Sequence, residues 1–241
     1  MSLIIAIHRL CQKFGYDFRR YSADNFPELK RRKVIDKQNI NLVLDIGASE
    51  GFYAEELREA GYKGRIMSFE PLGGSYARLN KSSEKDPLWD TFNMALGDKE
   101  DEVEMSVSGH VTSSSLLQMT DAHLNALQSS ATVSKEKIKV RPLNSFIGNQ
   151  IKTSDRIYMK VDVQGFEMFV LAGADKVLEQ VEAMEMELSL TPLYQGGPLF
   201  LDMIQHLQKL GFVLVSLSHV FTDPNTEQLL QVDGIFIKKL N

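Results

Sequence analysis

Hydrophobic and polar positions divide the chain into a short N-terminal part with helical spacing and a longer part built from apolar runs. The first part carries many charges, and Pro27 marks the start of a helix that we expect to reach about Asp36. The apolar runs that follow are short and continuous, which is typical of strands buried on both faces. We therefore expect a helical extension over residues 1–40 and one folded domain over residues 41–241.

Within the domain the apolar runs predict strands, and helical periodicity fills most intervals between them. The expected strands are 41–48, 64–69, 91–96, 156–163, 183–189, 212–218 and 234–238. The expected helices are 52–60, 73–82, 166–180 and 198–210. Alternation of strands and helices predicts an α/β fold of the Rossmann-like kind, in which helices cover both faces of a seven-stranded, mostly parallel sheet.

Two segments depart from this alternation. A polar turn at residues 223–225 joins the last two strands without a helix, so we expect an antiparallel hairpin at the C-terminal edge of the sheet. Residues 100–150 are less regular and are interpreted as an insertion beside the core. The insertion is expected to hold an exposed strand at 102–108, a Gly/Ser-rich loop at 109–117, a helix near 120–130 and a short strand at 138–141.

The first candidate site is the junction between the first strand and the first helix of the domain. Gly47 allows a tight turn and a close approach of the backbone to a ligand. The start of a helix presents unpaired N–H groups to a carboxylate, and Asp45 adds a negative charge at the end of the strand. Such a junction can hold a zwitterionic amino acid, for example a methionine moiety. The candidate binding residues of this junction are Asp45, Gly47, Ala48, Ser49, Gly51 and Phe52.

Two further acids end neighbouring strands. Glu70, followed by Pro71, ends the second strand, where an acid in such folds accepts hydrogen bonds from ribose hydroxyls. Asp162 lies near the carboxyl end of a later strand, at the edge where ligands bind, although it could also cap the next helix. The dinucleotide pattern G-x-G-x-x-G is absent because position 49 is Ser, which disfavours a pyrophosphate ligand.

Composition excludes several other classes of function. A net charge of −5 with one short basic run, Lys30–Lys33, disfavours nucleic-acid binding. The single cysteine, Cys11, permits no disulfide within the chain and is compatible with a cytoplasmic location. The five histidines are scattered without an i, i+4 pair, so we expect no metal site.

The N-terminal apolar stretch leaves the partners of the chain open. Residues 3–10 are too short a run to cross a membrane, and we expect no transmembrane segment. Their apolar side chains are expected to pack on the same chain, on a partner chain in a homodimer or on a membrane surface, in that order of preference.

An ordered series of motifs resembles the FkbM family of methyltransferases. The series runs through residues 41–238 and consists of Asp45–Tyr53, Phe69–Pro71, Asn93–Asp98, Thr112–Leu116, Lys160–Glu167 and Leu171–Ala174. The chain departs from the usual family pattern at Ser49, where Asn is usual, and at Gln164, where Glu is usual. The loss of that charge puts any role of position 164 as a base in question.

The resemblance implies an S-adenosylmethionine-dependent methyltransferase that acts on a hydroxyl oxygen of a small-molecule or glycan acceptor, such as a sugar or a secondary metabolite. It places the methionine end beside Asp45, Gly47 and Gly51, the ribose on Glu70 and the reacting centre at Asp162. The implied cofactor-binding residues are Asp45, Gly47, Ala48, Ser49, Gly51, Phe52, Glu70, Pro71, Met94, Ala95 and Asp162, of which Met94 and Ala95 lie near adenine.

Methyl transfer to an alcohol requires that the hydroxyl lose its proton, and a base within hydrogen-bond reach assists. The candidate catalytic residues are Asp162, Glu187 and His110, with His219 at the end of a further strand as another candidate base. Two alternative functions remain from the sequence. One is an NAD-dependent oxidoreductase on the same fold, and the other is a non-catalytic module that binds a cofactor.

Overall fold

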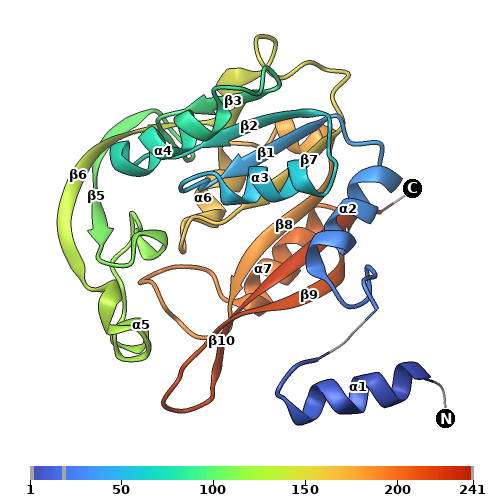
Figure 1. The fold of residues 1–241 in the computed structure, drawn as a ribbon. Helices are drawn as coiled ribbons and strands as arrows, with labels where there is room; N and C mark the ends of the chain where they lie inside the picture. Colours follow the sequence, from blue (N-terminus) through green and yellow to red (C-terminus); the bar gives the residue numbers. More distant parts are fainter. Residues whose placement is uncertain (1–2, 18–19, 240–241) are drawn as a thin grey trace.

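A seven-stranded sheet forms the centre of the protein in the computed structural model, which describes residues 3–17 and 20–239 (Figure 1). In spatial order its strands are β3 (Trp89–Phe92), β2 (Arg65–Phe69), β1 (Leu42–Ile46), β7 (Ile157–Val161), β8 (Val181–Ser189), β10 (Leu229–Lys238) and β9 (Phe212–Thr222). The first five run parallel to one another, whereas β10 pairs antiparallel with both β8 and β9. This arrangement confirms the Rossmann-like fold and the C-terminal antiparallel hairpin.

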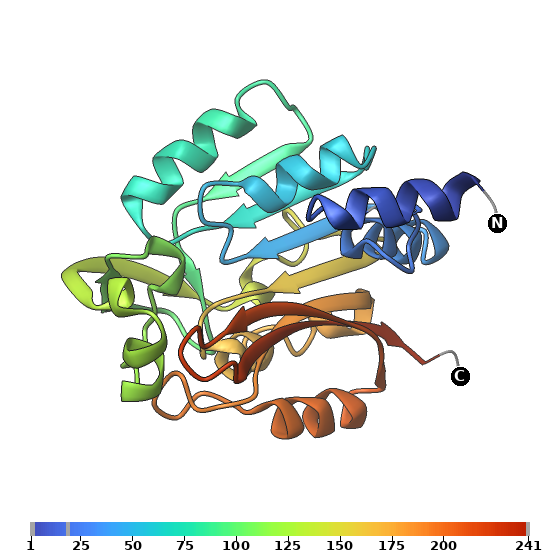
Figure 2. The same cartoon turned by 60° about the horizontal axis from the view of Figure 1, so that its bottom comes forward.

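Apolar side chains on the two faces of the sheet form separate cores. On one face α2 (Pro27–Lys37), α3 (Phe52–Glu59) and α4 (Gly73–Ser83) pack against the strands through buried residues such as Ile35, Leu57 and Leu79. On the other face α6 (Glu167–Ala172) and α7 (Phe200–Lys209) contribute to the larger core. In Figure 2 the sheet separates α3 and α4 above from α7 below. Helices thus cover both faces, as expected.

The irregular middle of the chain builds a second, smaller sheet. Its strands, in spatial order, are β4 (Ala95–Leu96), β6 (Thr132–Arg141) and β5 (Asp101–Ser108). The chain between β5 and β6 holds the 3-10 turns η1 (Val111–Ser113) and η2 (Gln128–Ser130) and the short helix α5 (Asp121–Ala126). A further 3-10 turn, η3 (Leu143–Phe146), leads back toward β7. The loop that contains η1 lies near the carboxyl ends of the main strands.

The expected third strand, 91–96, is wrong in one respect, because it divides into two strands of different sheets. β3 ends at Phe92 and β4 starts at Ala95. Between them the side-chain amide of Asn93 donates hydrogen bonds to the carbonyls of Glu70 and Pro71, at 3.0 and 2.9 Å. These bonds turn the chain away from the main sheet.

The expected helix 166–180 is also divided. α6 ends at Ala172, and a 3-10 turn, η4 (Val177–Gln180), follows separately. A Cβ atom built on Gly173 would lie 1.8 Å from the carbonyl oxygen of Gly97. The backbones of these two glycines are therefore in close contact, and the helix stops where they meet.

Three strands are longer than the apolar pattern indicates. β6 begins at Thr132, β9 continues to Thr222 and β10 begins at Leu229. The additional residues of β6 and β9 are largely exposed, so they lack the apolar alternation on which the expectation depended.

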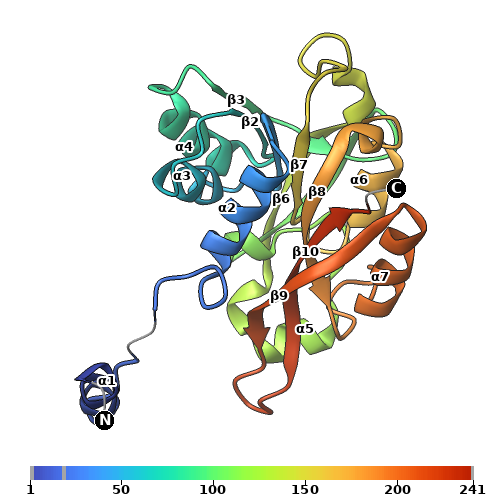
Figure 3. The same cartoon turned by 90° about the vertical axis from the view of Figure 1, so that its right-hand side faces the viewer.

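The N-terminal part contains two helices. α2 starts at Pro27 as expected and packs on the domain, whereas α1 (Leu3–Lys13) stands apart from the rest of the chain (Figures 1 and 3). Across the described ranges, no helix is both long and apolar enough to pass through a membrane.

Candidate active site

A tight turn after β1 forms the floor of the candidate site. Gly47 has φ +80°, and a Cβ atom built on it would lie 1.8 Å from the carbonyl oxygen of Asp162 on the neighbouring strand end. Gly51 has φ +99° and directly precedes α3. The backbone geometry therefore requires glycine at position 47, and it brings the two strand ends into contact.

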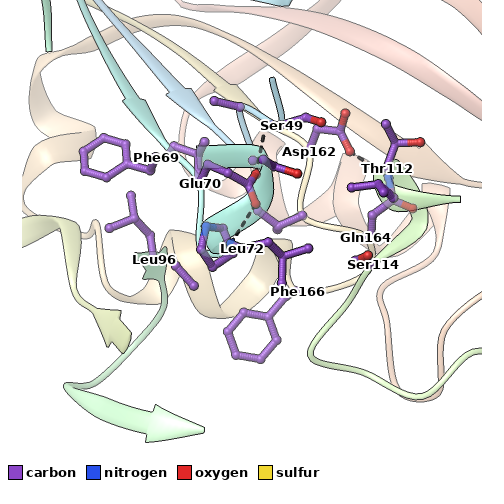
Figure 4. Close-up of a pocket in the computed structure, with 18 of the residues that line it drawn as sticks. Ser49, Phe69, Glu70, Leu72, Leu96, Thr112, Ser114, Asp162, Gln164 and Phe166 are labelled. Atoms are coloured by element: carbon purple, nitrogen blue, oxygen red, sulfur yellow. Dashed lines mark hydrogen bonds between the residues drawn. The ribbon is translucent and has the colours of Figure 1, made fainter. Parts of the chain in front are cut away.

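Glu70 lies beside this turn, at the end of β2 (Figure 4). Its carboxylate accepts one hydrogen bond from the backbone N–H of Ser49 and one from that of Leu72, each at 2.9 Å. Burial raises the pKa of Glu70 to about 7, while the two backbone N–H groups lower it in part. The carboxylate is held rigidly and is close to its titration point at neutral pH.

An elongated cavity extends from this turn across the carboxyl ends of β1, β2 and β7 (Figure 4). Its volume is about 980 Å3, including the part that opens to solvent. The cavity is lined by Ile46–Ser49, Phe52, Tyr53, Phe69–Leu72, Ser75, Ala95, Leu96, Met105, Val111, Thr112, Ser114, Leu116, Lys160, Asp162–Gln164 and Phe166.

Most of the residues expected at a cofactor site line this cavity. They are Gly47, Ala48, Ser49, Phe52, Glu70, Pro71, Ala95 and Asp162. The Gly/Ser-rich loop contributes Val111, Thr112 and Ser114, so it lies against the same space. One continuous cavity therefore brings together residues from five separate motifs.

Three expected binding residues lie outside the cavity lining. Asp45 is fully buried beneath it, and Gly51 packs toward Leu79 and Trp89. Met94 packs against the larger core, whereas its neighbour Ala95 faces the cavity. These three residues contribute to the surroundings of the site and not to its surface.

Asp45 acts on the cavity through Lys160. One oxygen of the buried carboxylate accepts a hydrogen bond from Ser68 Oγ at 3.0 Å, and the other lies 3.6 Å from Lys160 Nζ. Lys160 Nζ also donates to the carbonyl of Gly47 at 3.0 Å and lies 3.5 Å from Asp162. Sequence reasoning missed Lys160, although its position two residues before Asp162 on a strand places both side chains on one face.

The structure places two of the four candidate bases in cavities and the other two outside them. Asp162 lines the first cavity and also a second one, in which Glu187 lies. His110 is exposed, accepts or donates a hydrogen bond with Thr112 at 3.0 Å and does not line either cavity. His219 is exposed on β9 and bonds Thr222. The geometry favours the two carboxylates over the two histidines.

Gln164 connects these two carboxylates. Its amide nitrogen donates hydrogen bonds to Asp162 and to Glu187, both at 2.8 Å, and its amide oxygen accepts one from Tyr194 at 2.6 Å. A second amide, that of Gln231, also donates to Glu187 at 2.7 Å. The amide at position 164 therefore serves as a donor, which a carboxylate at this position would not be.

The environment of Glu187 favours its protonated form. Burial raises its pKa well above the ordinary value, and the nearby charges of Asp162, Glu167 and Asp233 raise it further. A buried carboxyl whose pKa is shifted in this way is a candidate for proton transfer.

Both departures from the usual family pattern have left-handed backbones. Ser49 has φ +49° and Gln164 has φ +55°. Asn adopts this conformation more readily than Ser, so Ser49 carries a modest backbone strain. The contact of Ser49 with Glu70 is made by its backbone, and the change of side chain leaves that contact intact.

Ionisation of Glu70 predicts a pH-dependent affinity for a ligand with a ribose diol. The carboxylate accepts hydrogen bonds best when ionised, and its pKa near 7 means that it gains a proton as the pH falls through neutrality. We expect the dissociation constant of S-adenosylhomocysteine to be about tenfold higher at pH 6 than at pH 8. Calorimetry across this range measures it. A Glu70→Gln variant should bind with little pH dependence. A variant that kept the full dependence would contradict the expectation that Glu70 holds the ribose hydroxyls.

No group of three or more His, Cys, Asp or Glu side chains in residues 3–17 and 20–239 is arranged to hold a metal ion. The candidate site is built from carboxylates, one lysine, amides, hydroxyls and apolar side chains.

Comparison with known proteins agrees with this geometry. The profile described as the methyltransferase FkbM domain matches residues 45–214. The chain is 22% identical over 201 residues to the 2-O-methyltransferase NoeI of Sinorhizobium fredii NGR234, over 80% of this chain and 82% of NoeI. The solved methyltransferase FkbM from Methylobacillus flagellatus KT is 15% identical, with a TM-score of 0.50 over 81% of this chain and 43% of that one.

The chain spans less than half of that solved protein, and the likeness between the two concerns the fold. The profile match, in contrast, covers well over half of the chain and contains the turn after β1, Glu70 and Asp162. The chain belongs to the FkbM family of methyltransferases.

Proposed function

We propose that the protein transfers a methyl group from S-adenosylmethionine to a hydroxyl oxygen of a small-molecule or glycan acceptor. The observation that carries the proposal is the single cavity in which Glu70 stands in one wall and Asp162 stands at the junction with a second cavity. Glu70 and Asp162 end strands β2 and β7, and ligands of such sheets bind at this edge.

The lining of the first cavity fits the parts of this cofactor. The rigid carboxylate of Glu70 suits the two ribose hydroxyls, and the apolar side chains of Leu96 and Phe166 suit a flat adenine ring. The first turn of α3 supplies N–H groups and partial positive charge for the methionine carboxylate. We therefore assign the methionine end to the turn after β1 and the adenine end to the region of Ala95.

The bound cofactor would supply an already activated methyl group, so the task of the chain is to position the acceptor and to receive its proton. The amide of Gln164 donates to one oxygen of Asp162 and to one oxygen of Glu187. The second oxygen of each carboxyl group makes no hydrogen bond to this amide. Glu187 is our candidate for the base: its ionised form receives the hydroxyl proton, and the raised pKa makes that carboxylate more basic than an ordinary glutamate. Asp162 orients the hydroxyl.

NoeI supports oxygen as the methylated atom, because it is a 2-O-methyltransferase. At 22% identity, NoeI supports the methylated atom in this proposal and not the identity of the acceptor molecule.

The test is calorimetric titration of the purified chain with S-adenosylmethionine, S-adenosylhomocysteine and NAD. We expect micromolar binding of both adenosyl compounds and none of NAD. Glu70→Ala should weaken binding about 100-fold, since hydrogen bonds to a charged group are worth about 1.5–3 kcal/mol each. Glu59→Ala, at an exposed acid on α3, is the matched control and should bind as the unmodified chain does.

Other outcomes separate the alternatives. Binding of NAD in place of the adenosyl compounds would overturn the proposal in favour of an oxidoreductase. A folded chain that bound none of the three would also overturn it.

A further inference from the structure

A second cavity lies directly beside the candidate cofactor cavity. It has a volume of about 620 Å3, including its open part, and shares Phe52, Tyr53, Lys160 and Asp162 with the first cavity. Its other walls come from the N-terminal extension, α3, β7, β8 and β10, through Arg31, Glu56, Val161, Glu185–Glu187 and Asp233. A ligand in this space would meet the first cavity at Asp162.

Acidic groups outnumber basic groups in this second cavity. The carboxylates belong to Glu56, Asp162, Glu185, Glu187 and Asp233, and the cations are Arg31 and Lys160. Both cations are occupied. Arg31 pairs with Glu185 and Glu56, and Lys160 is held by Asp45, Asp162 and the carbonyl of Gly47.

Glu185 is likewise fully engaged, because Arg31, Tyr53 and Tyr158 all donate to it. The carboxylate of Asp233 differs. It has no hydrogen-bond or ion-pair partner in the part of the chain that the structure describes, and it lines the cavity opposite Glu187 in the register of β10 and β8. The Asp233 carboxyl therefore has open capacity to accept hydrogen bonds, whereas Glu187 already accepts them from Gln164 and Gln231.

An unpaired polar group in a partly buried cavity is costly in free energy. We therefore expect a ligand in this cavity to donate a hydrogen bond to Asp233. A ligand anion would meet an excess of negative charge with no free cation to balance it. A hydroxyl or an ammonium group would instead satisfy Asp233.

We infer that the second cavity is the acceptor subsite and that it accepts polyols or amino-substituted polyols and excludes anionic ones, with Asp233 as the specificity-determining residue. This inference rests on the proposed function, which assigns the first cavity to the cofactor. It also gives the N-terminal extension a role, since Arg31 of α2 forms one wall and fixes Glu185.

The experiment is saturation-transfer NMR on the full chain, with and without S-adenosylhomocysteine, using three methyl glycosides of one hexose. These are the neutral glucoside, the amino sugar glucosaminide and the carboxylated glucuronide. We expect the first two to bind and the glucuronide to bind at least fivefold more weakly. An amino sugar that binds about as well as the neutral one points to recognition of hydroxyls, and a much tighter amino sugar points to recognition of charge.

Asp233→Asn removes the charge with little change of shape. It should weaken the amino sugar and raise the affinity of the glucuronide at least threefold, while S-adenosylhomocysteine, measured by calorimetry, binds as before. Asp202→Asn, at an exposed acid on α7, is the matched control and should change nothing.

Three results would overturn the inference: a glucuronide that binds as well as the glucoside, no saturation of any of the three sugars, or an Asp233→Asn variant identical to the Asp202→Asn control. Calorimetry keeps the two proposals apart. Absence of S-adenosylhomocysteine binding contradicts the proposed function, while sugar binding to the chain alone still tests the second cavity.

Discussion

Gly47→Ala is expected to abolish binding of S-adenosylhomocysteine and to lower the free energy of unfolding strongly. The new methyl group would be placed 1.8 Å from the carbonyl oxygen of Asp162, and this contact is with backbone that cannot rotate away. The backbone of Gly47, at φ +80°, is also unfavourable for alanine. Overpacking of about 1–3 kcal/mol and a left-handed backbone of about 1–2 kcal/mol together predict a loss of about 2–5 kcal/mol.

Because the strand ends of β1 and β7 must separate to relieve this contact, the cavity floor and Asp162 would move together. Denaturant unfolding measures the stability loss, and calorimetry measures the binding. Gly74→Ala is the matched control. Gly74 lies in the first turn of α4, and a Cβ atom added there would meet nothing within 4 Å. That variant should be unchanged or more stable by up to about 1 kcal/mol. A Gly47→Ala chain with normal affinity would show that the turn does not form the cofactor site.

The fold was predictable where local signals and burial agree. The turn after β1 combines an apolar strand, a glycine at positive φ and a helix start, all within a few residues, and each is visible in the sequence. The break between β3 and β4 was not predictable. It depends on Asn93, whose amide bonds two carbonyls that lie 22 and 23 positions earlier in the chain.

The site was predictable for backbone and strand-end positions and less so for side chains that meet across the fold. Gln164 suggested only a lost charge in the sequence. Its function as a donor between Asp162 and Glu187 depends on β8, and its own acceptor is satisfied by Tyr194, which lies beyond that strand. His110 looked suitable because of its loop, yet its side chain bonds that loop and faces neither cavity.

Arg31→Ala is expected to be the most destabilising change in the N-terminal extension. The guanidinium is buried, donates to both oxygens of Glu185 at 2.6 and 3.0 Å, and lies 4.4 Å from the centre of the Tyr53 ring. Removal of one partner of a buried ion pair costs about 3–5 kcal/mol, because the other charge stays buried without its partner. Lys33→Ala, at an exposed residue of the same helix, removes the same charge and should change stability by less than about 0.5 kcal/mol.

The pH dependence of this loss distinguishes an ion pair from simple packing. Burial alone would raise the pKa of Glu185, but Arg31 holds it below its ordinary value. In the unmodified chain the pair therefore stabilises the fold above the unfolded pKa of a glutamate, and this contribution is lost as the pH falls through the lower folded value. In the variant the pKa of Glu185 is raised, so protonation relieves the buried charge at acidic pH.

The difference in unfolding free energy between the two chains should consequently be larger at pH 8 than at pH 5, as measured by urea unfolding. Adding Glu185→Gln to Arg31→Ala removes the unpaired charge and keeps an acceptor for Tyr53 and Tyr158, so it should recover part of the loss at pH 8. An equal loss at both pH values, with no recovery in the double variant, would mean that Arg31 contributes by packing alone. Recovery would show that Arg31 stabilises the fold by balancing the buried charge of Glu185.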